Sequence, residues 1–361
     1  NEVIEASSFN LYYDNCNFVN MSASCVFLGK GEFNNCRWGA ACNQSSATEK
    51  RMGGALSHGT NSIITEHHTY TYRNCVSDST NMVSAAVAGH GSSLFTFSSH
   101  NAFFTVDGGS YRNGGGGILW GDNNDWKYTI SGNTYFKNFT SIGRFSTAAG
   151  AANTQGDVLI DGGLYEDCGD LVFTTVDATL YRNVTVRNMR VFNGRIMLNG
   201  INQLQVENNH FVERRAVVGT SPFATDLGDF AALQTRSVMW LQKISNANIV
   251  NNTLTVDSIY NNLVLYGIHL TPNGMTTINS GRDYFQQNIN IQGNTLRNFR
   301  YGIGTQSGGV NNVETIRRVN WTYRGNTVVT QSHTAADGFG IHVAPGVVAS
   351  NNVIYDMNTD A

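Results

Sequence analysis

The feature that most constrains the fold is a short pattern that recurs along the whole chain. Each copy is a stretch of alternating apolar residues that ends at a residue of one narrow type. That residue is Asn or Gly in every copy: Asn15, Asn35, Asn74, Gly108, Gly132, Gly162, Asn188, Asn208, Asn251, Gly293, Gly325 and Asn351. Asn and Gly enter the left-handed backbone region at the least cost, so the pattern predicts a one-residue bend in each copy.

Apolar residues flank the bend at constant distances. In the copy that ends at Asn188, Val184 and Val186 stand four and two residues before the bend, and Val191 stands three residues after it. Alternation with a period of two is the signal of a β-strand. A second apolar strand recurs in most copies, for example at 117–121, 195–199, 263–270 and 301–306. Each copy is therefore predicted to contain at least two strands.

The residue after the bend also repeats, which predicts a ladder. It is Cys16, Cys36 and Cys75 in the first three copies, and Asn in the last five, at Asn209, Asn252, Asn294, Asn326 and Asn352. Asn side chains stacked at one register hydrogen-bond from one coil to the next. The patterned part of each copy has a constant length, and the stretch between one copy and the next varies in length. This is expected for a solenoid with insertions on its outside. We therefore predict a single-stranded parallel β-helix of about twelve coils, in one domain that spans residues 1–361.

Composition excludes several classes of protein. The formal charge is −3, with 23 basic and 26 acidic residues mixed along the chain, which leaves no basic footprint for nucleic acid. No apolar run approaches the ~18 residues of a membrane span, and the first residues lack a signal-peptide pattern. Six Cys in a chain of this length are not a disulfide framework, and no metal site or cofactor is predicted. Coils begin and end close to both termini without a cap, so we expect a segment of a longer chain or ends covered by partners.

The Asn-rich bend between strands resembles the pectin-lyase-like right-handed parallel β-helix superfamily over essentially the whole chain. Within that superfamily the chain is most similar to the β-helical body of bacteriophage tailspike and capsule depolymerase proteins, in its free Cys, few Lys, loop insertions and missing caps. The resemblance implies a homotrimer on the virion tail, or otherwise extracellular, that binds and hydrolyses bacterial capsule or lipopolysaccharide O-antigen. A non-catalytic glycan-binding or structural fibre and a polysaccharide lyase are the alternatives.

Two sets of acidic residues are candidates for glycoside hydrolysis, which uses two carboxyl groups ~5 Å or ~6.5–9.5 Å apart. Asp167 and Glu213 stand five residues past their bends with one coil between them, so ~4.8 Å per coil separates them by roughly 9.6 Å. The second set is Asp177 with Asp226 and Asp229, which fall in a long insertion predicted at 222–242. For both sets the alternative is ordinary surface acids.

Candidate binding residues are cationic or aromatic. Arg214 and Arg215 adjoin Glu213 and suit an acidic sugar. Aromatic rings stack on the apolar faces of sugars while polar groups bind their edges. The further candidates on this ground are Trp120, Asp122, Trp126, Trp240, Tyr266 and His269. Core packing is the alternative for Trp120, and a hydrogen-bonded place in the wall is the alternative for His269.

Overall fold

The computed structural model describes residues 9–18, 29–38, 56–59, 68–78, 93–98, 102–114, 116–120, 125–139, 141–146, 155–175, 181–214, 237–257, 266–271, 286–305, 318–330, 339–343 and 346–356. All regular structure in these segments is β-strand. They contain no helix long and apolar enough to cross a membrane.

The strands form three stacks, and every pairing within a stack is parallel. The first stack holds the strands that lead into the bends: β1 (Phe9–Asp14), β3 (Gly29–Asn34), β6 (His68–Arg73), β9 (Ala102–Gly114), β11 (Asp125–Phe139), β13 (Gln155–Asp161), β16 (Tyr181–Arg187), β18 (Arg195–Glu207), β21 (Ala247–Val250), β24 (Gln286–Gln292), β27 (Arg318–Arg324) and β30 (Val347–Ser350).

The second stack holds the strands that follow the bends, together with the carboxyl-terminal parts of β9 and β11. They are β2 (Asn17–Phe18), β4 (Arg37–Trp38), β7 (Val76–Asp78), β14 (Leu164–Glu166), β17 (Arg190–Phe192), β19 (His210–Glu213), β22 (Thr253–Val256), β25 (Thr295–Phe299), β28 (Thr327–Thr330) and β31 (Val353–Asp356). The third stack holds the amino-terminal part of β18 and β5 (Leu56–Gly59), β8 (Ser93–Ser98), β10 (Gly116–Trp120), β12 (Ser141–Ser146), β15 (Asp170–Thr175), β20 (Ser237–Ile244), β23 (Tyr266–Thr271), β26 (Tyr301–Thr305) and β29 (Phe339–Ile341).

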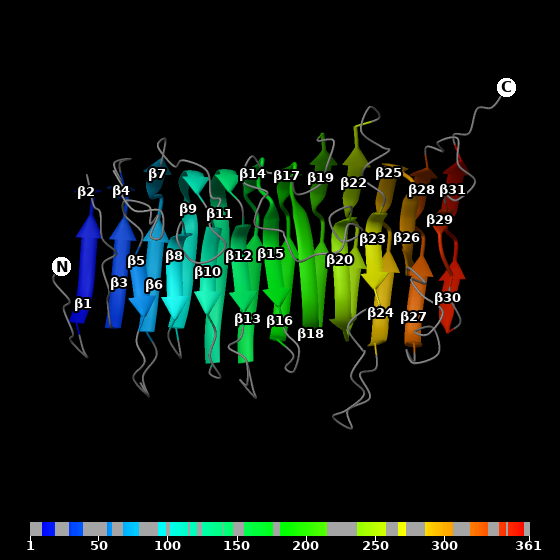
Figure 1. Cartoon of the computed structure of the whole chain (residues 1–361), viewed down its shortest axis with the longest axis horizontal. Coiled ribbons are helices and arrows are strands. Elements are labelled where there is room, and N and C mark those ends of the chain that lie inside the picture. The colour runs from blue at the N-terminus through cyan, green and yellow to red at the C-terminus, as the bar shows by residue number, and fades with distance from the viewer. Residues whose placement is uncertain are drawn as a thin grey trace, which may run out of the picture.

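The stacks follow one another around a common axis and form a right-handed parallel β-helix. Figure 1 shows the strands side by side along the long axis, from β1 at the amino-terminal end to β31 at the other. The first stack contains one strand from each of twelve coils. The predicted fold class and coil number are confirmed.

The bends explain why these residues form coils. All twelve predicted bend residues have positive φ, between 50° at Asn74 and 87° at Gly162. One residue in the left-handed region turns the chain sharply from the first stack into the second, and only Asn and Gly adopt it cheaply. The bend therefore falls at the same place in every coil and keeps the stacks in register.

The predicted asparagine ladder is also confirmed. Each Nδ2 of Asn209, Asn252, Asn294 and Asn326 donates to the Oδ1 of the next Asn along the axis, at 2.9–3.0 Å. The same Nδ2 donates to a backbone carbonyl of the preceding coil. These four side chains are 2% exposed or less, so each rung satisfies buried polar groups of the adjoining coils.

The cysteines occupy the same place in the first coils. Cys36 and Cys75 are buried, Cys16 is half-buried, and all three are free thiols. The Sγ of Cys75 lies 3.3 Å from the carbonyl oxygen of Phe33 in the preceding coil. Burial raises the pKa of the Cys75 thiol to about 12. The prediction that these residues stack in the wall as small buried side chains is confirmed for Cys36 and Cys75.

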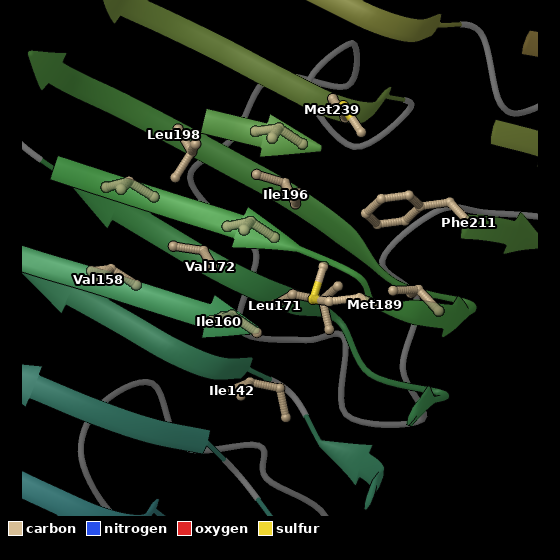
Figure 2. Packing of buried hydrophobic residues seen from close by; sticks show 14 of the residues in the cluster. Ile142, Val158, Ile160, Leu171, Val172, Met189, Ile196, Leu198, Phe211 and Met239 are labelled. Atoms are coloured by element: carbon tan, nitrogen blue, oxygen red, sulfur yellow. The ribbon is translucent and has the colours of Figure 1, made fainter. Parts of the chain in front are cut away.

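The interior is one continuous apolar core. Rings stack along the axis in the amino-terminal coils, with Phe33 and Tyr72 4.9 Å apart between centroids and nearly parallel. Aliphatic side chains dominate from Val158 onward. Figure 2 shows Ile160, Leu171 and Phe211, which come from three different stacks, in this shared core. A core of this kind fixes the backbone and leaves outward residues to carry chemistry.

Candidate functional site

The third stack between β15 and β26 is buried on both of its faces. Met239, Leu241, Ile268 and Leu270 point into the core. The residue between each pair, Trp240 or His269, points the other way and is still 3% or 1% exposed. Trp240 packs on Met197 in an apolar cluster of its own, separate from the core. We call the side chains on this outer side the outer strip: Met197, Ser237, Trp240, Tyr266, His269 and Tyr301.

Strand register brings these residues together. Met197 pairs with Trp240, and Trp240 pairs with His269, on successive strands. Tyr266 pairs with Tyr301 in the same way. The expectation that Trp240 belongs to an insertion at 222–242 is wrong, because β20 begins at Ser237 and Trp240 lies within the strand.

Aromatic rings stack within the outer strip. The Tyr266 ring lies 4.2 Å from the His269 ring and 4.6 Å from the Tyr301 ring, measured between centroids, and is close to parallel with the first. Burial raises the pKa of Tyr266 to about 12, with a further rise from Tyr301 and an opposing effect of Arg300. The phenol is therefore protonated at neutral pH.

His269 is a neutral, buried imidazole. Burial lowers its pKa to about 4, and its Nδ1 lies 3.1 Å from the hydroxyl oxygen of Ser237. If the Ser237 hydroxyl donates to Nδ1, the proton of the neutral ring is on Nε2, which is then a donor. This pairing of Ser237 with His269 was not predicted from the sequence.

Two nitrogens of the outer strip have no hydrogen-bond partner within the described part of the chain. They are Nε2 of His269 and Nε1 of Trp240, on neighbouring strands. A buried polar group without a partner costs about 1–3 kcal/mol, so such groups are rare and invite an explanation. An oxygen atom brought next to these nitrogens would remove this cost. This property makes the outer strip the candidate site.

A buried ion pair lies at the start of the same strands. Arg195 is 0% exposed and Asp170 is 5% exposed, with 2.5 Å between Nε and Oδ1. The two residues pair between β15 and β18. Breaking a buried pair of this kind leaves an uncompensated charge, so separation of β15 and β18 at this point is disfavoured.

The first predicted acid pair is in register but does not line one open groove. Asp167 lies in the left-handed region with φ of 53°, and its Oδ1 accepts a 2.6 Å hydrogen bond from Nδ2 of Asn193. Glu213 is 1% exposed and pairs with Val256, a core residue. Alternation from Phe211, which points inward, places Glu213 on the inner side as well. The catalytic roles of both acids stay predictions.

The other predicted site residues are only partly described. The guanidinium of Arg214 is exposed and lies 4.9 Å from the centroid of the Phe192 ring. The backbone of Trp120 ends β10 and that of Trp126 lies near the start of β11, but their side chains are outside the described part. The residues that lie entirely outside it are Asp122, Asp177, Arg215, Asp226 and Asp229.

No cluster of potential metal ligands occurs among the residues that the structure describes. The comparisons with known proteins add no relationship. No protein family matches the chain, and no curated protein or solved structure matches it significantly. What the protein does must therefore be argued from its own residues.

Proposed function

We propose that this β-helix binds bacterial surface polysaccharide and hydrolyses it, in the manner of a phage tailspike, as a homotrimer on the virion tail. The observation that carries the proposal is the outer strip. It combines stacked aromatic rings with two polar nitrogens that lack a partner among the described residues. Rings and a few directed polar groups are the usual components of a sugar-binding site.

The outer strip serves as a rigid floor for such a site. Its side chains other than Tyr301 are buried to 4% exposure or less, so a glycan does not lie on it as on an open surface. Residues 215–236, 272–285 and 306–317 adjoin its strands in sequence. Segments that connect the strands of a rigid scaffold are where binding and catalytic residues are usually found.

Asp177, Asp226 and Asp229 are the acids that this arrangement favours for catalysis. Asp177 follows β15, which pairs with the first strand of the outer strip, and the other two precede β20, which carries Ser237 and Trp240. Asp167 is retained as a weaker candidate, because Asn193 already occupies one of its carboxylate oxygens. Glu213 is the weakest candidate, because its burial keeps it from an open groove.

A binding fibre without catalytic activity is the second candidate function. It is favoured by the two predicted acids that the structure describes, because Asp167 accepts a hydrogen bond from Asn193 and Glu213 is buried. A fibre needs only the scaffold and its outer surfaces. The two candidates differ in whether bound glycan is cut.

Product analysis separates these functions. The protein is incubated with a panel of capsule and lipopolysaccharide glycans, and the products are examined by mass spectrometry. Short products with saturated ends are expected, and their loss in Asp177→Asn, Asp226→Asn or Asp229→Asn would identify the acids. Asp14→Asn is the matched control, since Asp14 is an exposed acid of the first coil. Unsaturated ends would replace the hydrolase with a lyase, and intact bound glycan would leave a binding fibre.

The outer strip has its own test. Trp240→Phe keeps a buried ring but removes the Nε1–H donor. Because the strip is buried, we expect the substitution to act on a bound glycan indirectly, by altering the support of the site, and to weaken glycan binding about two- to ten-fold. Trp321→Phe is the control, because Trp321 is 1% exposed in the core and belongs to no outer surface. Equal affinity in the two variants would remove the strip from the site.

A further inference from the structure

A different outer surface of the solenoid is covered by uncharged amides. It is formed by side chains that lie on the outer side of the first stack, while residues between them, such as Leu204 and Ile249, point into the core. We call it the amide face: Gln203, Gln205, Asn246, Asn248, Asn288, Asn290, Asn320 and Thr322. All are exposed or half-exposed, and none is charged. The amide face belongs to the first stack, whereas the outer strip belongs to the third.

Hydrogen bonds between coils hold the asparagines of this face in two ladders. In the first, Nδ2 of Asn288 donates to Oδ1 of Asn246 at 2.8 Å, and Nδ2 of Asn320 donates to Oδ1 of Asn288 at 3.0 Å. In the second, Nδ2 of Asn290 donates to Oδ1 of Asn248 at 3.2 Å. Successive strands are ~4.8 Å apart, so the amides repeat at that interval along the axis.

The ladders leave much of the hydrogen-bonding capacity unused. Each amide has two N–H donors and an oxygen with two lone pairs. A rung such as Asn288 uses one donor and one lone pair within its ladder. No hydrogen bond of the Gln203 or Gln205 side chain is found in the described part of the chain. The amide face therefore presents uncharged donors and acceptors side by side, with its Asn side chains in fixed orientations.

We propose that the amide face binds an uncharged, hydroxyl-rich glycan chain that lies along the axis of the solenoid. A sugar hydroxyl both donates and accepts a hydrogen bond, which matches an amide that offers both. Because the ladders already hold the Asn side chains, binding costs less side-chain entropy than on freely rotating residues. This surface is separate from the outer strip, and the inference rests on the proposed function only in taking a glycan as the ligand.

The composition of the amide face disfavours other occupants. Protein interfaces rely on aromatic residues, Met and Arg at their centres, and the eight side chains of this face include none. Nucleic acids and acidic polymers are bound through cationic side chains, which these positions also lack. An uncharged glycan is the partner whose chemistry fits.

The test is affinity electrophoresis in native gels that contain dextran, galactomannan or hydroxyethylcellulose. The double variant Gln205→Glu, Asn248→Asp replaces two exposed N–H₂ groups with carboxylate oxygens. Asp at position 248 still accepts the hydrogen bond from Asn290, so the ladder is kept. Each lost donor weakens binding about two- to ten-fold, and the pair roughly 4- to 100-fold. The control, Asn10→Asp with Asn17→Asp, adds the same charge at exposed positions of the first coil.

The expected result is that at least one neutral glycan retards the natural protein and the control, and retards the amide-face variant much less. The proposal is overturned if no neutral glycan retards the natural protein, or if both variants are retarded equally. A sedimentation coefficient that changes only in the amide-face variant would also overturn it, since the face would then join copies of this chain. Glycan cleavage is measured separately on the capsule and lipopolysaccharide panel. A protein that binds one of the neutral glycans but cleaves no member of that panel would reject the proposed hydrolase and leave this inference standing.

Discussion

Breaking the buried asparagine ladder at Asn294 is expected to uncouple the coils on either side of it. The Asn294 side chain is 0% exposed and takes part in four hydrogen bonds. Its Nδ2 donates to the carbonyl of Ile249 at 2.8 Å and to Oδ1 of Asn326 at 3.0 Å. Its Oδ1 accepts from the backbone N–H and from Nδ2 of Asn252, both at 2.9 Å. Asn294→Ala removes all four without changing the bend, which is at the preceding Gly.

The magnitude follows from which partners are left without a hydrogen bond. Oδ1 of Asn326 keeps the backbone N–H of residue 294, and Nδ2 of Asn252 keeps the carbonyl of Val206. The carbonyl of Ile249 and the backbone N–H of Asn252 lose the side-chain partner. The N–H of Asn252 is left without a partner at a cost of about 1–3 kcal/mol, whereas the carbonyl of Ile249 also lies in the β21–β24 ladder and loses one hydrogen bond worth about 0.5–1.5 kcal/mol. The substitution should therefore destabilise this region by about 1.5–4.5 kcal/mol.

Hydrogen exchange measured by mass spectrometry is the suitable assay, because a solenoid's stability is a sum of local coil terms and need not be two-state. Amides of 247–257 and 289–299 should lose protection by about ten-fold or more, while those of the first coils remain unchanged. The control is Asn290→Ala, which removes a single hydrogen bond at a half-exposed position. It should cost about 0.5–1.5 kcal/mol at most.

Equal loss of protection in Asn294→Ala and Asn290→Ala would refute the reasoning. The ladder would then contribute no more than a surface hydrogen bond, and backbone pairing with core packing would have to account for the coupling between coils. A loss of protection spread evenly over all coils would instead show that the solenoid unfolds as one unit.

Three further perturbations test other parts of the fold. Gly109→Ala should be severely destabilising, because φ is +101° and a Cβ at this position meets backbone atoms of the preceding coil. Gly325→Ala has open space around the new Cβ and should lower the stability by only about 1–2 kcal/mol. Thermal unfolding of the two variants tests this difference. Asp170→Asn should cost about 3–5 kcal/mol in urea unfolding, because Arg195 would keep a buried charge without its counter-ion, and a cost below 1 kcal/mol would contradict this. Burial holds the pKa of His269 at about 4, below its value near 6.5 in the unfolded chain. The stabilising contribution of the neutral ring is therefore complete above pH 6.5 and is lost as the pH falls toward 4. The free energy of unfolding of a His269→Gln variant should depend less on pH between about 4 and 6.5.

The architecture was predictable because its signals are local and repeat in every coil. A left-handed bend needs Asn or Gly whatever surrounds it, and all twelve predicted positions adopt positive φ. The ladder followed from the same register, since like residues one coil apart must stack. Neither inference required knowledge of a distant contact.

The outer strip was not predictable in the same way. Residues 237–242 are buried on both faces of the sheet, so they show no alternation that would tell outward from inward. The Asp170–Arg195 pair was hidden for a different reason. Asp170 is eight residues past its bend and Arg195 seven past its own, so the two residues pair between β15 and β18 although they do not share a position in the repeat. The burial of Glu213, in contrast, was readable, because a count of two from Phe211 places it inward.

The residue after the bend is Cys in the first three coils and Asn in the last five, and this difference indicates what each coil requires at that position. Cys36 Sγ approaches the carbonyl of Tyr13, and Asn209 Nδ2 donates to the carbonyl of Val186, which stands at the same place two residues before a bend. A donor to the preceding coil is therefore present in both cases. A thiol lacks the strong acceptor that Oδ1 offers to the following coil. The first coils must be joined mainly by backbone pairing and stacked rings, whereas the later coils, which carry the outer strip and the amide face, gain a continuous buried hydrogen-bond chain. This hydrogen-bond chain thus lies in the coils that carry both proposed binding surfaces, where fixed side-chain positions matter most.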